Sequence, residues 1–308
     1  MPELSIIIPT HNRPRLLERV VGQLQAQSVD AARYEVLVVD SASSDDTPQA
    51  VQRLAARHPN LKAFRTDRPG AAAARNMGLE AARAPLLVLL DDDILAEKDF
   101  LARVLAAAGD QPGRVLLGRI VAPWADSTDP FHRFLLESGD VNSYAFKNND
   151  NVPAQFFYTA CVAIPREVLG ATRFDENFVV YGIEDVEFGL RLLRGGARMV
   201  FRPEIEVRHE YFPEFGAYRE KKFRTGRSLG YFLENSENAP HFYVETAAQR
   251  LYFRFYRIAA APLAGLACFW ERLRKRTGPL NRVLYHWYYR DLRVQMFNGM
   301  RAYRREKA

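Results

Sequence analysis

Short apolar runs alternate with amphipathic segments along the N-terminal part of the chain. The runs 4–8, 34–39, 61–65 and 86–90 have the length and the aliphatic content of buried strands. Between them, apolar residues recur at helical spacing, as in 16–24, and an alanine-rich helix is expected over 71–83. Strands that alternate with helices predict βαβ units. The expected fold class is therefore α/β, with a mostly parallel central sheet flanked by helices.

Weaker signals predict several further elements. A strand is expected near Phe156, a helix over 183–193, and short strands near Met199 and Val207. Asn12 is expected to cap the helix that begins near Pro14, because its side chain can accept a hydrogen bond from the first helical N–H groups. Beyond Tyr211 the periodicity is helical and no βαβ unit is evident. We therefore expect one domain over residues 1–210 and a helical C-terminal extension over 211–308.

Charge divides the chain at the same point. Residues 1–210 carry 24 Lys and Arg against 29 Asp and Glu, whereas residues 211–308 carry 19 against 8. A basic segment favours an anionic partner. The extension is also rich in aromatic rings, namely Tyr252, Phe253, Phe255, Tyr256, Phe269, Trp270, Tyr285, Trp287, Tyr288 and Tyr289.

Three interpretations of this basic, aromatic extension stay open. Interfacial helices bury rings while their cations meet anionic headgroups, which predicts contact with a membrane surface. Alternatively, the rings pack on the N-terminal domain or on a second subunit of a homo-oligomer. Nucleic acid is the third possible partner, and it is not expected, since no recognised motif supports it. The apolar stretch 258–270 is too short to span a bilayer.

Composition narrows the cellular setting. The chain has 308 residues, of which 48% are hydrophobic, enough for a sizeable core. Its two cysteines, Cys161 and Cys268, have neither disulfide-framework nor metal-type spacing. The N-terminus lacks the features of a secretory signal. We expect a cytoplasmic protein, with peripheral contact at the inner face of the cell membrane as the extension's predicted role.

Acidic residues follow two of the predicted strands. Asp40 ends the second strand, and Asp91, Asp92 and Asp93 follow the run 86–90. Ligands bind beyond the carboxyl ends of strands in such sheets. In an extended chain Asp91 and Asp93 point the same way, and such a pair with diphosphate oxygens suits Mg²⁺ or Mn²⁺. A polar exit from the strand is the simpler interpretation of the aspartate run taken alone.

Five segments in order extend this pattern to a family. They are SIIIPTHNRPRLL, EVLVVDSASSDDT, GAAAARNMGLEAA, LLVLLDDDIL and FDENFVVYGIEDVEFGLRLLRGGARMVFRPEIEVRH. Over residues 4–210 the chain resembles the family 2 glycosyltransferases. The resemblance implies the GT-A fold, a nucleotide-diphosphate sugar as donor, Mn²⁺ or Mg²⁺ as cofactor, and inversion at the anomeric carbon.

The resemblance assigns nucleotide-sugar contacts to several positions. It implies that the loop after the first strand approaches the nucleotide and that Asp40 accepts hydrogen bonds from the base, usually uracil. Arg75 would lie near the nucleotide or its phosphates. The nucleotide-sugar-binding residues implied in this way are Pro9, Thr10, Asn12, Asp40, Arg75, Asp91, Asp92 and Glu184.

The same resemblance implies the metal and catalytic residues. Asp93 is the expected direct metal ligand, with Asp91 and His209 as further candidates. Asp185 would be the general base that takes the proton from the acceptor hydroxyl. The position of Asp185 is consistent with this role. An acid at a helix N-terminus is favoured in its ionised form, and a base must be deprotonated to work. The simpler interpretation is that Glu184 and Asp185 only satisfy the first helical turn.

These expectations define one main function. It is the transfer of a sugar from a nucleotide-diphosphate sugar, a UDP-sugar being expected, to a hydroxyl of a carbohydrate or lipid-linked acceptor, as in polysaccharide, glycolipid or other cell-surface glycan synthesis. The alternative is a non-catalytic nucleotide-sugar-binding scaffold or regulator. A dehydrogenase or a nucleotidyltransferase would need a glycine-rich loop after the first strand, where PTHNRP stands. Glu187 and Arg191, four residues apart, are expected to form a surface ion pair.

Overall fold

The chain divides into two compact units. A computed structural model describes residues 1–124, 127–141, 144–180, 182–237, 239, 269 and 282–307. The first unit, here the sheet unit, comprises 1–123, 145–179 and 184–211. The second, here the helical unit, comprises the described residues of 124–144, 180–183 and 212–308. Two segments from within residues 1–210 therefore belong to the helical unit.

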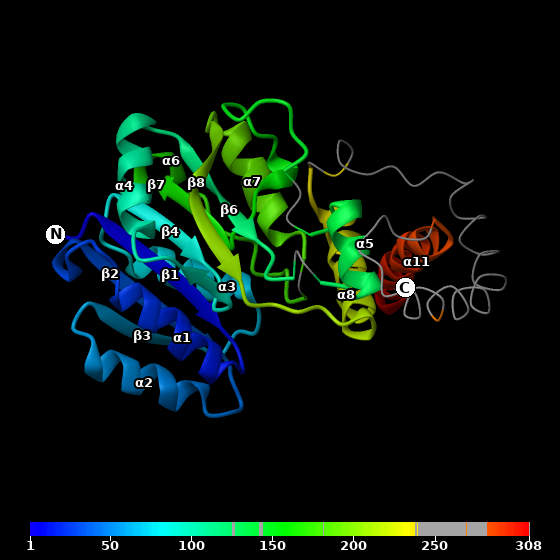
Figure 1. Ribbon diagram of the computed structural model, residues 1–308, viewed down its shortest axis with the longest axis horizontal. Helices are drawn as coiled ribbons and strands as arrows, with labels where there is room; N and C mark the ends of the chain where they lie inside the picture. The colour runs from blue at the N-terminus through cyan, green and yellow to red at the C-terminus, as the bar shows by residue number, and fades with distance from the viewer. Residues whose placement is uncertain are drawn as a thin grey trace. The chain divides into compact units, whose positions relative to one another are not determined.

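The sheet unit is built on an eight-stranded sheet of order β3-β2-β1-β4-β7-β6-β8-β5 (Figure 1). The strands β3, β2, β1 and β4 are parallel, as are β6 and β8, whereas β7 runs antiparallel to β4 and β6 and β5 antiparallel to β8. This confirms a mostly parallel sheet. The strands are β1 Leu4–Thr10, β2 Tyr34–Ser41, β3 Leu61–Thr66, β4 Leu86–Leu90, β5 Ile94–Ala96, β6 Val115–Val121, β7 Cys161–Pro165 and β8 Met199–His209.

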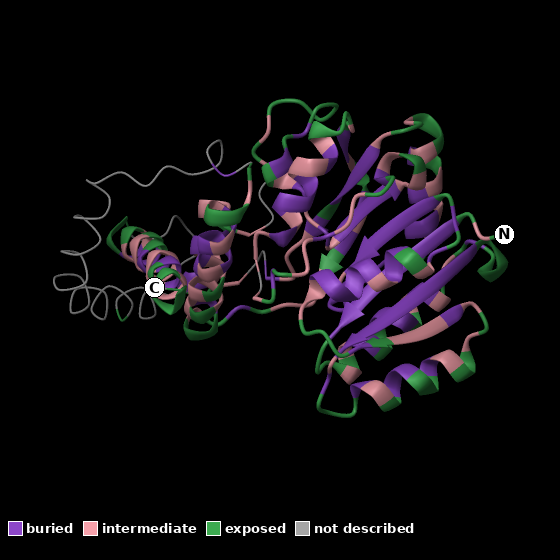
Figure 2. Ribbon diagram, turned by 180° about the vertical axis from the view of Figure 1, so that it is seen from behind, coloured by how far each residue is buried: buried purple, intermediate pink, exposed green. Residues whose placement is uncertain are grey.

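Helices cover both faces of the parallel part of the sheet. Ile6 and Ile8 of β1 belong to the core that also contains Leu17 of α1, while Ile7 points to the opposite face. There a Cβ on Gly78 of α3 would lie 2.4 Å from Ile7, so only glycine lets that helix approach so closely. Figure 2 shows the central strands buried, and β1, β2 and β4 are buried along their whole length, whereas the edge strand β3 is only partly buried. The helices of this unit are α1 Pro14–Gln25, α2 Thr47–Arg57, α3 Ala71–Ala81, α4 Phe100–Asp110, α6 Arg166–Leu169 and α7 Glu184–Arg194, with short 3-10 turns Ala31–Arg33 and Ala154–Phe156.

Three local expectations are wrong. The chain near Phe156 forms a 3-10 turn, and the strand starts only at Cys161. The two short strands near Met199 and Val207 are one strand, β8, whose pairing with β6 shifts register after Gly118 and leaves a bulge that includes Pro203. Proline has no N–H to donate to a hydrogen bond between strands, so Pro203 in the sequence suggests a break between two strands. Asn12 has φ +53° and does not cap α1, since the residue at the N-cap is Arg13.

The helical unit contains three described long segments, α5 Pro130–Ser138, α8 Phe215–Asn235 and α11 Arg282–Lys307. Aromatic rings pack between them: Phe131 of α5 lies 5.2 Å from Phe215 and 5.2 Å from Tyr288 between ring centroids. Part of the aromatic set is therefore core. The rings at 252–256, the stretch 258–270 except Phe269, and Cys268 lie outside the described residues. In the ranges that are described, no helix is both long enough and apolar enough to cross a bilayer.

Candidate active site

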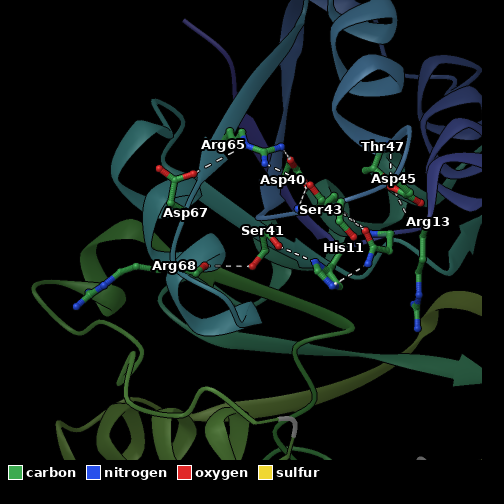
Figure 3. A network of polar contacts seen from close by, with 12 residues as sticks. His11, Arg13, Asp40, Ser41, Ser43, Asp45, Thr47, Arg65, Asp67 and Arg68 are labelled. Atoms are coloured by element: carbon green, nitrogen blue, oxygen red, sulfur yellow. Dashed lines mark hydrogen bonds and ion pairs between the residues drawn. The ribbon is translucent and has the colours of Figure 1, made fainter.

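The loops after β1 and β2 are joined by a network of polar contacts (Figure 3). Nδ1 of His11 donates to the carbonyl of Ser41 at 2.7 Å, so its Nε2 is left to accept from the Asn12 amide at 3.1 Å. Oδ1 of Asn12 accepts from the Ser44 backbone N–H at 2.9 Å, and the Asn12 backbone N–H donates to Ser43. Asn12 thus fixes one loop against the other. Pro9 and Thr10, at the end of β1, are buried.

Asp40 is buried in the same network. Its Oδ2 accepts from Arg65 at 2.5 Å and its Oδ1 from the Ser43 N–H at 3.2 Å. Arg65 lies beside Asp40 because the two residues are register partners in the parallel pair of β2 and β3. A nucleotide base that contacts Asp40 would therefore also contact the Arg65 guanidinium.

The aspartate run divides between two groups of partners. Asp92 accepts from Thr10 at 2.7 Å and from Arg13 at 2.9 Å, and Asp93 accepts from the same Arg13 nitrogen at 2.7 Å. Asp91 instead accepts from Arg75 at 2.9 Å. The expected common direction of Asp91 and Asp93 is not found, because β4 ends at Leu90 and the chain turns, with the Ile94 N–H donating to the Asp91 carbonyl. Period-two alternation holds only in extended chain.

His209 reaches the aspartate run through the sheet. The short strand β5 pairs antiparallel with β8 in a register that sets Ile94 beside His209. Nε2 of His209 then lies 3.4 Å from Oδ1 of Asp93. Hydrogen bonding from His209 and the charge of Arg13 outweigh burial, and the pKa of Asp93 is lowered. The geometry thus brings two of the expected metal ligands together and sets Asp91 apart.

Arg75 connects this edge of the sheet to α7. Its guanidinium is almost fully buried and binds Asp91 at 2.9 Å and Glu184 at 3.3 Å. It also stacks on Phe174, 5.6 Å from the ring centroid. The next residue, Asn76, donates from its amide to the Phe174 carbonyl and to Glu176, both at 2.9 Å. Glu184 is therefore buried on Arg75, and α3 fixes the segment that precedes α7.

Asp185, in the first turn of α7, accepts from the Val186 backbone N–H at 2.8 Å. Burial and the neighbouring carboxylates of Glu184 and Asp91 raise the pKa of Asp185 to about 7, although Arg75 opposes them. The net shift is opposite to the one that a helix N-terminus alone would give. The turn before the helix is unusual, since Gly182 and the β-branched Ile183 both have positive φ, +105° and +75°.

One ion pair on α7 differs from expectation. Arg191 donates to both Glu187 oxygens at 2.7 Å, so the predicted pair forms. Glu187 is nevertheless buried, and Arg191 also donates to the Arg173 carbonyl. The prediction of a surface ion pair is therefore wrong. Arg191 joins α7 to the loop before the helix, and Glu187 is buried beneath it.

The site carries an excess of negative charge that a metal ion would balance. Five carboxyl groups, those of Asp91, Asp92, Asp93, Glu184 and Asp185, face two guanidinium groups and one imidazole. Burial is the largest cause that raises the pKa of Asp92, to about 6. Among the described residues no three acidic, histidine or cysteine groups are gathered closely enough to hold an ion by themselves. An ion held by Asp93 and His209 would therefore need further ligands from a bound molecule, and diphosphate oxygens are of the type that Mg²⁺ prefers.

Sequence reasoning missed Arg13 and Arg65 as site residues. Arg65 had a detectable signal, since it ends a predicted strand next to the one that ends at Asp40. Arg13 stands in the HNRP segment, but its partners lie on another loop. Only the fold brings them together.

The fold and this site define a class. The architecture is that of the GT-A glycosyltransferases, and the profile of glycosyl transferase family 2 matches residues 5–172. The chain belongs to that family.

Characterised relatives include two glucosyltransferases. The chain is 33% identical over 238 residues to validoxylamine A glucosyltransferase of Streptomyces hygroscopicus subsp. jinggangensis, covering 68% of this chain and 56% of that protein. It is 30% identical over 186 residues to the GalNAc(5)-diNAcBac-PP-undecaprenol beta-1,3-glucosyltransferase of Campylobacter jejuni, covering 60% and 58%. The chain thus spans little more than half the length of these relatives.

Solved structures share the fold at low identity. A mannosyltransferase from Pyrobaculum calidifontis, in complex with GDP-Man and Mn²⁺, has a TM-score of 0.65 at 21% identity, with 100% of this chain and 88% of that chain covered. TarS from S. aureus in complex with UDP-GlcNAc has a TM-score of 0.54 at 17% identity, with 99% and 92% covered.

Proposed function

We propose that this protein is an inverting glycosyltransferase that moves a sugar from a nucleotide-diphosphate sugar to an acceptor hydroxyl. The observation that carries the proposal is the link through Arg75. It ties Asp91, next to the aspartate pair that binds Thr10 and Arg13, to the first turn of α7, which presents Asp185. The proposed donor-binding edge and the proposed base are thus linked through one buried guanidinium.

Each side chain has a definite task in this mechanism. Asp40 and Arg65 bind the base, and the loop of Thr10 and Asn12 encloses the nucleotide. Asp93 and His209 would hold Mn²⁺ or Mg²⁺, which stabilises the negative charge on the departing diphosphate. Asp185 takes the proton from the acceptor oxygen as that oxygen forms its bond to the anomeric carbon and the bond to the diphosphate breaks. One displacement inverts the configuration, and no second carboxylate acts as nucleophile.

The donor is proposed to be a UDP-sugar, with glucose first to test. Support comes from the two relatives named as glucosyltransferases, and from a structural neighbour solved with UDP-GlcNAc. The mannosyltransferase neighbour with GDP-Man makes GDP-sugars the necessary comparison. Glucosyl transfer or donor hydrolysis should be seen with UDP-glucose and Mn²⁺, and chelation should abolish it.

The decisive variant is Asp185→Asn. Asparagine keeps the shape of the side chain and cannot accept the proton, so we expect turnover to fall by at least about 10²-fold while UDP still binds. NMR of the product should show the inverted anomer. A non-catalytic scaffold would bind UDP-sugar and turn over none with either protein, and that outcome would refute the proposal.

We further propose that α11 contacts an anionic membrane surface where a lipid-linked acceptor resides. Tyr289 and Arg293 are exposed, with the guanidinium 5.1 Å from the ring centroid, and Val283, in the first turn of the helix, is 55% exposed. The double change Tyr289→Ser and Arg293→Gln should reduce flotation with phosphatidylserine vesicles, whereas Arg15→Gln on α1 should not. Equal flotation of all three proteins would refute this role. Homo-oligomerisation stays a prediction, which light scattering after gel filtration would test.

A further inference from the structure

The guanidinium of Arg13 binds two consecutive residues of the aspartate run, Asp92 and Asp93. A single guanidinium nitrogen lies 2.9 Å from Oδ1 of Asp92 and 2.7 Å from Oδ2 of Asp93. The Arg13 side chain is 43% exposed, whereas those of Asp92 and Asp93 are 7% and 10% exposed. The guanidinium therefore covers the carboxylate pair from the solvent side.

The position of Arg13 is fixed by its backbone. Its N–H donates to Oγ1 of Thr47 at 3.0 Å, and its carbonyl accepts the first hydrogen bond of α1, from Leu17. Only the side chain is free to change direction, and in Figure 3 it extends away from the contacts of His11, Asp40 and Ser43. The backbone of Arg13 is thus held in place, and rotation of its side chain alone would move the guanidinium.

The carboxylates contacted by Arg13 overlap with the proposed metal ligands. Asp93 has one oxygen on Arg13 and the other facing His209, so the aspartate has no oxygen without a neighbour. A divalent ion on Asp93 would lie within a few ångström of the guanidinium and repel it. Asp92 would still attract the guanidinium through its Oδ1, while its Oδ2 stays bound to Thr10. From there the exposed end of Arg13 could reach the diphosphate that shares the ion.

We propose that Arg13 is a built-in counter-ion of Asp92 and Asp93, which a divalent ion displaces from Asp93, and that the released guanidinium binds the pyrophosphate of the donor. Guanidinium groups suit this second partner because their fork of donors matches phosphate oxygens. This inference rests on the proposed function, since it requires the metal and the donor diphosphate at this edge. It makes Arg13 a positioning residue with two opposed effects on binding.

The opposed effects provide the test. Binding of Mn²⁺ alone is measured by EPR of the free ion, and binding of UDP at saturating Mn²⁺ by calorimetry, for the wild type and Arg13→Gln. Glutamine removes the competing charge, so Mn²⁺ alone should bind about tenfold more tightly, while UDP at saturating Mn²⁺ should bind about tenfold more weakly because the released guanidinium is missing. Arg13→Lys keeps the charge and should stay near the wild type for Mn²⁺.

Arg15→Gln changes an exposed arginine two residues further on, in α1; it is the matched control and should change neither affinity. Unchanged or weaker Mn²⁺ binding by Arg13→Gln would overturn the counter-ion role, and unchanged UDP binding would overturn the pyrophosphate role. Circular dichroism of each variant checks that it is folded. A wild type that binds no Mn²⁺ even with UDP present would instead remove the metal from the proposed function.

Discussion

At the scale of single residues, Arg75 has the most consequential position in the site. It is the cation that opposes the rise of the Asp185 pKa, and it does so while it also binds Asp91 and Glu184. Loss of this buried positive charge would remove the interaction that lowers the pKa of Asp185. The chemistry of Asp185 should therefore depend on a residue that need not touch the acceptor.

Replacing Arg75 should shift the pH profile of the reaction. As the proposed base, Asp185 must be ionised, so kcat/KM in the wild type should fall as the pH drops below about 7. Arg75→Met removes the charge that lowers this pKa, and the half-maximal point should move up by about one pH unit. The measurement is the pH dependence of kcat/KM, with Arg75→Lys expected to restore most of the profile. A uniform loss of activity with an unmoved profile would mean that Arg75 acts only structurally.

Ionisation of Asp92 should lower the stability of the folded protein. Its pKa in the folded protein is raised from 3.8 to about 6, so the folded state binds the proton more tightly than the unfolded state does. The free energy of unfolding therefore decreases as pH rises from about 4 to about 6, by up to about 3 kcal/mol. Asp92→Asn escapes this cost, since its amide can still accept from Arg13 and donate to the Thr10 hydroxyl.

Urea denaturation of Asp92→Asn at pH 7.5 and at pH 4 tests this sign. The variant should be at least as stable as the wild type at pH 7.5, and the difference should shrink at pH 4, where both side chains are largely neutral. A variant that is less stable at pH 7.5 by more than about 1 kcal/mol would show that the charged hydrogen bonds outweigh burial.

At the scale of elements, the helical unit depends on a close crossing of α8 and α11. A Cβ on Gly226 would lie 1.9 Å from the Met296 carbonyl oxygen, and one on Gly299 would lie 2.0 Å from that of Phe223. Both obstacles are backbone atoms, which cannot turn aside as a side chain can. The absence of side chains at these two positions is therefore what sets the distance between the helices.

Gly226→Ala should separate the two helices. We expect a loss of about 1–3 kcal/mol in the free energy of unfolding, the usual cost of overpacking, despite the better helix propensity of alanine. Gly216→Ala, in the first turn of the same helix, meets nothing within 4 Å and should be neutral or stabilising by up to about 1 kcal/mol. Thermal unfolding followed by circular dichroism compares them, and equal melting temperatures would contradict the argument.

The two halves of the sheet differ in how well the sequence predicts them. The parallel strands β1 to β4 follow from local runs, and their ends correctly gather Asp40 and the aspartate run at one edge. The antiparallel strands depend on distant partners: β5 has three residues, and only its pairing with β8 brings His209 to Asp93. For the same reason the contact of Arg13 with the aspartates is invisible to spacing, since it joins residues 79 and 80 positions apart.

At the scale of the whole molecule, all the described residues assigned to the donor lie in the sheet unit. That unit contains the loops after β1 and β2, the aspartate run, and α7 with Asp185. The helical unit has its own aromatic core of Phe131, Phe215 and Tyr288. A donor should therefore stabilise one unit more than the other.

Hydrogen exchange with and without UDP and Mn²⁺ should reveal this asymmetry. A ligand that binds only the folded state raises the free energy of opening of the segments that hold it. Amides in 10–13, 41–47, 91–94 and 184–187 should exchange more slowly by about tenfold or more at saturating UDP, while those of α8 and α11 should change little. Mn²⁺ alone should affect chiefly 91–94 and the end of β8, because Asp93 and His209 are its proposed ligands. Equal protection of α8 and α11 by UDP would mean that the helical unit takes part in donor binding, and the assignment of the donor site to the sheet unit alone would then be wrong.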